Sequence, residues 1–221
     1  MKEKISEIKK RIDAVKKENG LTQEVTIVAA SKMVSAEKLN LLKECGITVC
    51  GENRVQELLE KFDNVCGISW HLIGSLQTNK VKYIIDKVDL IHSVDRSSLA
   101  DEIDKQARKR GKVMDVLVEI NTGEEESKSG VMPDKAFELM EYVKSKPNLS
   151  FKGVMGVFPV GADDILYQKL QEIFIEAKKR YGVTILSSGM SGDYEKAVKY
   201  GSTMVRIGSG IFGQRNYTQR N

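Results

Sequence analysis

Several features that would place this chain in a special class of protein are scarce or missing. Only three cysteines occur, at positions 45, 50 and 66, and they form no CxxC pair, so neither a disulfide framework nor a cysteine-rich metal site is expected. No apolar run approaches the roughly 18 residues of a membrane-spanning helix, and the first 20 residues form a charged amphipathic helix rather than a signal peptide. The 35 basic and 31 acidic residues are interspersed and give a net charge of +4, which does not indicate a nucleic-acid surface. We therefore expect a cytoplasmic protein with no membrane or nucleic-acid partner.

Short β-branched runs alternate with longer stretches of helical period along the 221 residues. Eight strands are predicted, at 25–31, 47–51, 69–74, 89–93, 114–120, 151–158, 183–189 and 203–208. Helices are expected between them, at 35–46, 55–62, 97–111, 134–145 and 167–182. This alternation predicts a (β/α)8 TIM barrel in a single domain spanning 1–221, with residues 1–20 as an additional N-terminal helix packed outside the barrel. An open doubly wound sheet is the alternative, but no GxGxxG fingerprint follows the first strand.

The first predicted strand leads directly into a lysine. Seven uncharged residues, 25–31, precede Lys32, whose amine must either reach water or meet a group that uses it. In a barrel the functional residues lie at the C-terminal ends of the strands, and the last strand closes beside the first. That last strand contributes Arg206, which lies between two apolar residues and needs an acceptor or an aromatic face, because burial of an unpaired charge is costly. We therefore expect Lys32 and Arg206 to share one pocket.

Two loops rich in glycine and serine, 187–193 and 207–213, follow the last two predicted strands. Glycine lets a backbone approach a ligand closely, and the first turn of a helix presents unpaired N–H groups and a positive dipole end. The loops after strands seven and eight bind phosphate in many barrels. The hydroxyls of Ser191 and Ser209, with N–H groups near Met190, Gly208 and Ser209, are predicted to bind phosphate. Ordinary helix capping is the alternative interpretation.

A lysine, an arginine and a phosphate site in one small pocket suggest an aromatic phosphate ester that bears an aldehyde. Pyridoxal 5'-phosphate fits this description, because its aldehyde forms a Schiff base with lysine. Five segments carry a family resemblance: ASK (30–32), GENRVQE (51–57), WHLIGSLQTNK (70–80), EESKSG (125–130) and SSGMSGDYEKAVKYGSTMVRIGSGIFGQR (187–215). Together they resemble the pyridoxal phosphate homeostasis proteins, a single-domain family built like the barrel half of the fold-type III alanine racemases. Ser188, where the family commonly has Met, and GVFP (156–159) depart from the family pattern.

The resemblance implies specific roles for the pocket residues. Lys32 would carry the internal aldimine, Arg206 would face the pyridine nitrogen, and Ser191, Gly208 and Ser209 would hold the phosphate. Met190, Asn53 and His71 complete the expected cofactor site, and no metal is expected. The implied function is intracellular homeostasis of the cofactor, which the protein would hold without robust catalysis. Apo forms of pyridoxal-phosphate-dependent enzymes are the candidate recipients.

A weak amino-acid racemase is the first alternative function. Racemisation needs a proton-transfer group on each face of the carbanion, and Lys32 is the one candidate base for the first face. Asn53, Tyr217, solvent and His71 are the candidates for the second, although His71 is better interpreted as a hydrogen-bonded core histidine. Arg206 cannot protonate the pyridine nitrogen, which weakens the electron sink. The racemases also carry a second, β-rich domain, for which we expect no room here, and we therefore expect a monomer.

Two further expectations concern the same pocket. The acidic segment 123–127 is predicted to be a solvated loop, with Lys128 and Ser129 as residues that could close over the pocket. The second alternative function is a barrel enzyme acting on a sugar phosphate, with Lys32 as a base or an aldolase-type lysine. This alternative uses the phosphate loops but explains Arg206 less well.

Overall fold

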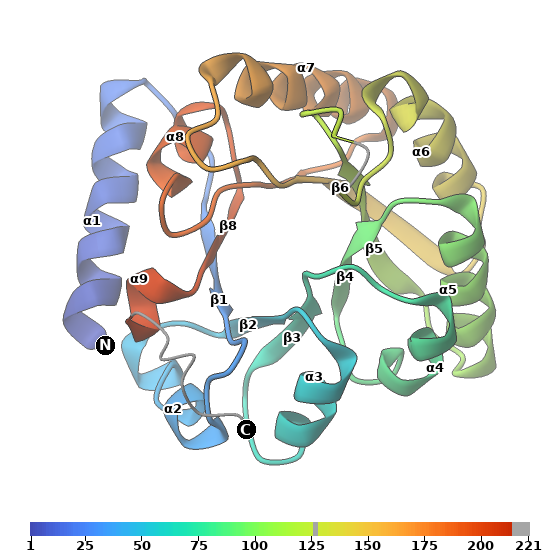
Figure 1. Cartoon of the computed structure of the whole chain (residues 1–221), viewed down its shortest axis with the longest axis horizontal. Helices are drawn as coiled ribbons and strands as arrows, with labels where there is room; N and C mark the ends of the chain where they lie inside the picture. Colours follow the sequence, from blue (N-terminus) through green and yellow to red (C-terminus); the bar gives the residue numbers. More distant parts are fainter. Residues whose placement is uncertain (126–127, 214–221) are drawn as a thin grey trace.

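Eight short segments rich in β-branched residues pair in parallel and close into a barrel in the computed structural model, which describes residues 1–125 and 128–213 (Figure 1). The strands are β1 (Thr26–Ala30), β2 (Val49–Glu52), β3 (Ser69–Leu72), β4 (Leu90–Val94), β5 (Met114–Ile120), β6 (Leu149–Gly156), β7 (Ile185–Ser187) and β8 (Met204–Ile207). Each strand pairs with its neighbour in sequence, and β8 pairs with β1. The predicted (β/α)8 barrel is confirmed, and the open sheet is excluded.

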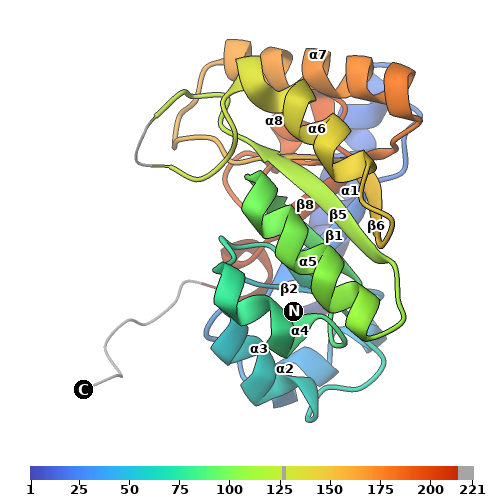
Figure 2. The ribbon, with the colours of Figure 1, turned by 90° about the vertical axis from the view of Figure 1, so that its right-hand side faces the viewer.

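Helical segments follow the strands and cover the outside of the barrel. The α-helices are α1 (Lys2–Glu18), α2 (Ala36–Asn40), α3 (Val55–Phe62), α4 (Val81–Ile84), α5 (Ser97–Lys109), α6 (Ala136–Lys144), α7 (Asp164–Tyr181), α8 (Tyr194–Lys199) and α9 (Ser209–Phe212). Three short 3-10 segments, η1 (Lys43–Cys45), η2 (Thr78–Lys80) and η3 (Pro133–Lys135), accompany them. Figure 2 shows α5 and α6 lying against the outer face of β5 and β6. None of the helices in the described ranges is both long and apolar enough to cross a membrane.

Most predicted boundaries differ from the structure by one or more residues, and the helix predicted over 35–46 is divided into α2 and η1. Two of the differences have clear local reasons. β7 ends at Ser187 rather than at 189, because Gly189 turns the chain with φ +89°. A Cβ at Gly189 would lie 2.5 Å from the Cβ of Ala197, so a side chain would not fit there. α7 begins at Asp164 rather than at 167, following the extended residue Asp163. The tight turn at Gly189 brings the loop 187–193 onto the start of α8.

Helix α1 lies along the outside of the barrel, against α8 and α9 (Figure 1). Its isoleucines at positions 5, 8 and 12 are buried, and this spacing places them on one face of the helix. Helix α9 begins with Ser209, one of the predicted phosphate-binding residues. The N-terminal helix therefore packs against the element that carries the last glycine-rich loop.

The side chains inside the barrel form two layers, an apolar layer and, nearer the C-terminal ends of the strands, a polar layer. Leu90, Leu117 and Met155 form an apolar cluster inside the barrel, with Ile185 and Met204 packed against it. Side chains two residues apart in a strand point to the same face. The next inward residues toward the C-terminal ends are polar on four of these strands: His92 on β4, Glu119 on β5, Ser187 on β7 and Arg206 on β8. A buried polar layer thus lies directly beneath the end of the barrel where catalytic and binding residues of this fold are found.

Candidate functional site

A cavity of about 570 Å³ opens at the C-terminal ends of the strands, within the usual size range of small-molecule sites. The loops after β1, β2, β3, β6, β7 and β8 all contribute to its lining. Seven of the eight cofactor-binding residues predicted from the sequence line it: Lys32, Asn53, Met190, Ser191, Arg206, Gly208 and Ser209. Ala30, Ile73, Val157 and Gly192 complete the lining. The structure therefore brings the predicted residues together, while their roles toward a ligand stay predictions.

Lys32 lies two residues beyond the end of β1 and is half-buried against the cavity. Its amine makes no hydrogen bond or ion pair with any residue that the structure describes. The sequence left two possibilities for the Lys32 amine, contact with bulk water or contact with a group that uses it. The geometry supports the second possibility, because the side chain lines a pocket. An uncommitted amine beside a cavity is available as a nucleophile.

Arg206 is 4% exposed and has the acceptors that a buried arginine requires. Its guanidinium donates to the Ser187 carbonyl (2.9 Å), the Ser187 hydroxyl (2.8 Å) and the Gly156 carbonyl (3.0 Å). Burial lowers the pKa of Arg206 to about 10, while Glu119 and Asp193 oppose that shift. The side chain is therefore charged at neutral pH, and its hydrogen bonds to β6 and β7 hold it in one orientation.

Ser191 links the two glycine-rich loops. Its Oγ accepts hydrogen bonds from the N–H groups of Gly208 (3.2 Å) and Gly210 (3.1 Å). The hydroxyl proton of Ser191 is thus left for a ligand, and the Ser209 side chain is exposed beside it. The N–H groups of Met190 and Gly208 do not complete the site as predicted, because the first donates to the Asp193 carboxylate (2.6 Å) and the second to the Ser191 hydroxyl (3.2 Å).

The charge of the cavity favours an anion. Lys32 and Arg206 contribute two positive charges, and no carboxylate occurs among the described residues that line it. Ile73, Val157 and Met190 add apolar surface. A second, larger cavity of about 940 Å³ lies outside the barrel beside α1 and α8, but Lys32 and Arg206 do not line it. The smaller cavity is therefore the candidate site for an anionic ligand with an apolar body.

The structure does not bring every predicted residue to this cavity. His71 is buried in the barrel interior, with its Nδ1 3.0 Å from Nε2 of His92, and it is absent from the described lining residues. Its contacts match the interpretation as a hydrogen-bonded core histidine. Lys128 pairs with Glu125 at 2.5 Å. Tyr217 and residues 126–127 lie outside the described ranges.

Comparisons with known proteins identify the family. The model of the alanine racemase N-terminal domain family matches residues 4–216. A pyridoxal phosphate homeostasis protein of Aquifex aeolicus is 43% identical over 97% of this chain and 98% of its own length. The chain belongs to the pyridoxal phosphate homeostasis protein family.

Solved structures similar to this member of the pyridoxal phosphate homeostasis protein family include the following two. A protein of unknown function from Bifidobacterium adolescentis aligns with a TM-score of 0.88 at 29% identity, over 96% of this chain and 94% of that one. PipY of Synechococcus elongatus, solved with pyridoxal phosphate bound, aligns with a TM-score of 0.79 at 27% identity, over 92% of this chain and 99% of that one. The resemblance seen in the sequence motifs is thus confirmed.

The homeostasis-family barrel also contains functional candidates that the sequence did not reveal. Nδ1 of His92 lies 3.0 Å from the Ser187 hydroxyl, and Nε2 of the same ring lies 3.0 Å from Nδ1 of His71. The Ser187 hydroxyl also accepts a hydrogen bond from Arg206, so His92 connects His71 with Ser187 and Arg206. Burial lowers the pKa of His71 to about 4 and that of His92 well below its usual value, so both rings are neutral at pH 7. Burial, reinforced by Asp95, raises the pKa of Glu119 to about 7, although Arg206 opposes the shift. The Oε2 atom of Glu119 has no hydrogen-bond partner among the described residues.

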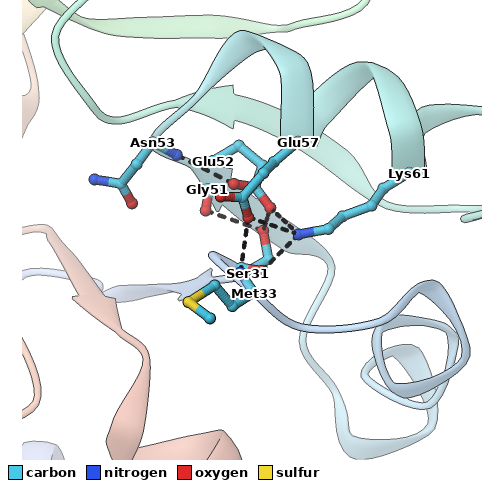
Figure 3. A network of polar contacts seen from close by, with 7 residues as sticks. All are labelled: Ser31, Met33, Gly51, Glu52, Asn53, Glu57 and Lys61. Carbon is cyan, nitrogen blue, oxygen red and sulfur yellow. Dashed lines mark hydrogen bonds and ion pairs between the residues drawn. The ribbon is translucent and has the colours of Figure 1, made fainter. Parts of the chain in front are cut away.

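A second set of residues that the sequence did not indicate, three charged side chains from β2 and α3, surrounds the turn that carries Lys32 (Figure 3). Glu52, at the end of β2, and Glu57 and Lys61, on α3, contact the residues on both sides of Lys32. In the sequence Glu57 and Lys61 look like an ordinary solvated i, i+4 pair. The available signal was Glu52, because a carboxylate that follows a buried strand requires a cation or hydrogen-bond donors.

Proposed function

We propose that this protein binds pyridoxal 5'-phosphate covalently through Lys32 and serves in the homeostasis of that cofactor. The observation that supports this most directly is the convergence of Lys32, Arg206 and both glycine-rich loops on one cavity of about 570 Å³. The Aquifex aeolicus relative is named a pyridoxal phosphate homeostasis protein, and PipY was solved with pyridoxal phosphate bound. The cavity of this chain has the size, positive charge and apolar surface that such a ligand needs.

The residues present fit the cofactor. When bound, pyridoxal phosphate supplies an aldehyde that condenses with a primary amine. Lys32 provides that amine and makes no other polar contact with a described residue. Ser191 and Ser209 would hold the phosphate through their side chains, which line the cavity, and Gly208 would support them by orienting the Ser191 hydroxyl with its N–H. Arg206 would face the pyridine nitrogen, to which its permanently charged guanidinium could donate a hydrogen bond without giving up a proton.

A binding role is favoured over a racemase by the chemistry of the lining. Among the described lining residues, Lys32 is the one side chain that offers a candidate general base. Asn53 cannot accept a proton, and His71 is hydrogen-bonded within the barrel interior. A second proton-transfer group is therefore missing from the described part of the site, whereas covalent holding needs only one amine.

The finer parts of the proposal concern the setting in the cell. We infer that the protein acts in the cytoplasm as a monomer and delivers the cofactor to apo forms of pyridoxal-phosphate-dependent enzymes. The open cavity at the barrel end supports reversible loading and release. Three cysteines without close spacing fit a reducing compartment.

Titration of the purified protein with pyridoxal phosphate tests the proposed function. The native protein should turn yellow with one cofactor per chain, and Lys32→Arg, which keeps the charge but cannot condense with an aldehyde, should stay colourless. A native protein that remains colourless would overturn the proposal. Retention of a sugar phosphate without colour would select the sugar-phosphate alternative. Exchange of the Cα hydrogen of amino acids at ordinary enzyme rates, ~1–1000 per second, would select the racemase.

A further inference from the structure

We propose that Glu52, Glu57 and Lys61 form a positioning cluster that fixes the backbone turn carrying Lys32. Glu57 and Lys61 contact the peptide groups on either side of Lys32, and Glu52 contacts the Lys61 ammonium and the Ser31 hydroxyl (Figure 3). The functional consequence, faster and tighter cofactor attachment at Lys32, rests on the proposed function. The structural part of the proposal, in which buried charged side chains hold the turn, does not depend on the proposed function.

Helix α3 holds both peptide groups that flank Lys32. The Lys61 ammonium donates to the Ser31 carbonyl at 2.8 Å, and that carbonyl belongs to the peptide group before Lys32. The Glu57 carboxylate accepts the N–H of Met33 at 2.8 Å, and that N–H belongs to the peptide group after Lys32. Glu57 and Lys61 lie four residues apart, on the same face of α3. One helix face therefore fixes the direction in which the Lys32 side chain leaves the backbone.

Glu52 connects this clamp to the barrel. Its Oε1 accepts from the Lys61 ammonium (2.6 Å) and from the Ser31 hydroxyl (2.8 Å). Its Oε2 accepts the N–H of Asn53 at 3.2 Å, and Asn53 lines the cavity. Glu52 lies on β2, so the same carboxylate ties the Lys32 turn and a second lining residue to the strand beside β1.

The positioning cluster is not a solvated ion-pair network. Glu52 is fully buried, and Glu57 and Lys61 are 5% and 8% exposed. Burial raises the pKa of Glu52, which Lys61 and Ser31 oppose. Burial also acts to raise the pKa of Glu57, but the Met33 N–H and Lys61 outweigh it, and the pKa lies below its usual value. Burying such charges is costly, and two carboxylates share one ammonium, so the arrangement needs a reason other than stability.

The backbone of the turn shows what the cluster must hold. Met33 has φ +59°, one of two non-glycine residues in the described ranges with a positive φ. A side chain in this left-handed region costs free energy and persists only where surrounding contacts impose it. The hydrogen bond from the Met33 N–H to Glu57 is such a contact. Without it the turn should relax and carry the Lys32 amine away from the position from which it reaches a ligand.

The first test needs no cofactor. Amide hydrogen exchange in the native protein should show the Met33 N–H protected to the same degree as the Ser31 N–H, which donates within the barrel at 2.9 Å. Exchange of the Met33 amide at the rate of an open loop would contradict the positioning cluster directly.

The second test uses variants of the cluster. Glu57→Met removes the acceptor of Met33, and Glu57→Gln retains an oxygen that can accept it. Glu57→Met should expose the Met33 amide and slow the attachment of pyridoxal phosphate by ~10-fold or more, the scale expected when a reacting group is misplaced. Glu57→Gln should restore most of both properties. The matched control is Ile103→Val in the distant helix α5, which should lower the thermal midpoint and leave attachment unchanged.

The outcomes separate the cluster from the proposed function. A native protein that does not take up pyridoxal phosphate would reject the proposed function. Acetylation of Lys32 by acetic anhydride, followed by mass spectrometry, then still compares its reactivity in the native protein and in Glu57→Met. Attachment and acetylation within twofold of the native values in folded Glu57→Met would overturn the positioning role. If Glu57→Met does not fold, the double variant Glu52→Gln with Lys61→Met, which removes the charges in a balanced way, is judged by the same criterion. If neither folds, the exchange rate of the native Met33 amide decides.

Discussion

Lys32 and Lys61 carry the same amine, but their surroundings give those amines different uses. The Lys61 ammonium contacts three acceptors, Ser31, Glu52 and Glu57, and is almost fully buried. Lys32 is half-buried beside the cavity, and its amine contacts no described acceptor. An ammonium that donates all three of its protons is a structural cation, whereas an uncommitted one can lose a proton and attack a carbonyl.

At the same scale, Glu119 makes the stability of the barrel depend on pH. Its pKa is raised from 4.5 to about 7 by burial and by Asp95, while Arg206 opposes the shift. Between these two values the folded protein binds more protons at this site than the unfolded chain, so the native protein loses stability as the pH rises. Glu119→Gln has no proton to lose, and its stability relative to the native protein should increase across this window by up to about 3 kcal/mol.

Urea unfolding of both proteins at about pH 5 and about pH 8 measures that difference. The neutral histidines His71 and His92 are common to both proteins, so their contribution cancels. Above about pH 7 the difference should be constant. A difference that does not change between the two pH values would show that the Glu119 carboxyl titrates normally in the folded state.

At the scale of elements, β7 and β8 form the sparsest joint of the barrel. The register between them contains one pair of residues, Ser187 with Met204. The buried hydroxyl of Ser202 supplements this joint, because it accepts from the Ser188 N–H at 3.2 Å and lies within 3.0 Å of the carbonyls of Leu186, Ser188 and Met204. Both glycine-rich loops begin at these two strands, so the joint also sets the spacing of the predicted phosphate-binding residues.

Ser202→Ala should therefore lower the free energy of unfolding by about 1 kcal/mol, the net value of a typical hydrogen bond, because the Ser188 carbonyl loses the Ser202 hydroxyl while the Ser188 N–H keeps the Met204 carbonyl at 3.0 Å. Chemical unfolding monitored by the fluorescence of Trp70 gives the value. The control is Ser98→Ala in helix α5, where the side chain is exposed and the change should stay within about 0.5 kcal/mol. Equal effects of the two substitutions would show that the Ser202 hydroxyl does not support the joint.

The arrangement of the elements also explains which site residues could be predicted from the sequence and which could not. Lys32, Arg206 and the two glycine-rich loops were predictable as neighbours, because each follows or ends a strand and the strand ends of a barrel converge. His92, Glu119 and Ser187 were not singled out, because barrel strands are buried on both faces and alternation does not separate the inside from the outside. Glu57 and Lys61 were not predicted, because two opposite charges four residues apart on a helix are usually exposed. Nothing in the sequence indicates that the ends of the neighbouring strands bury this pair. His71 lies within β3 rather than beyond its end, and its ring contacts His92 in the interior polar layer.

At the scale of the whole molecule, the barrel places the cavity at one end, and the outer helices supply few of its lining residues. Among the described residues, the lining comes from strand ends, the loops that follow them and the first residue of α9, Ser209. We expect the native protein to run as a monomer of 24.7 kDa in multi-angle light scattering, with and without pyridoxal phosphate. A stable dimer, or dimerisation on loading, would contradict the proposed monomer and would call for a partner surface near the cavity.

The central claim is that one amine of this chain, on Lys32, bonds to the cofactor. Reduction of the pyridoxal-phosphate-loaded protein with borohydride, followed by peptide mapping, tests it most directly. We predict a single modified residue, Lys32, at close to one label per chain, and no label on the buried Lys61. Label spread over several lysines, or concentrated on a lysine away from the cavity, would contradict the account.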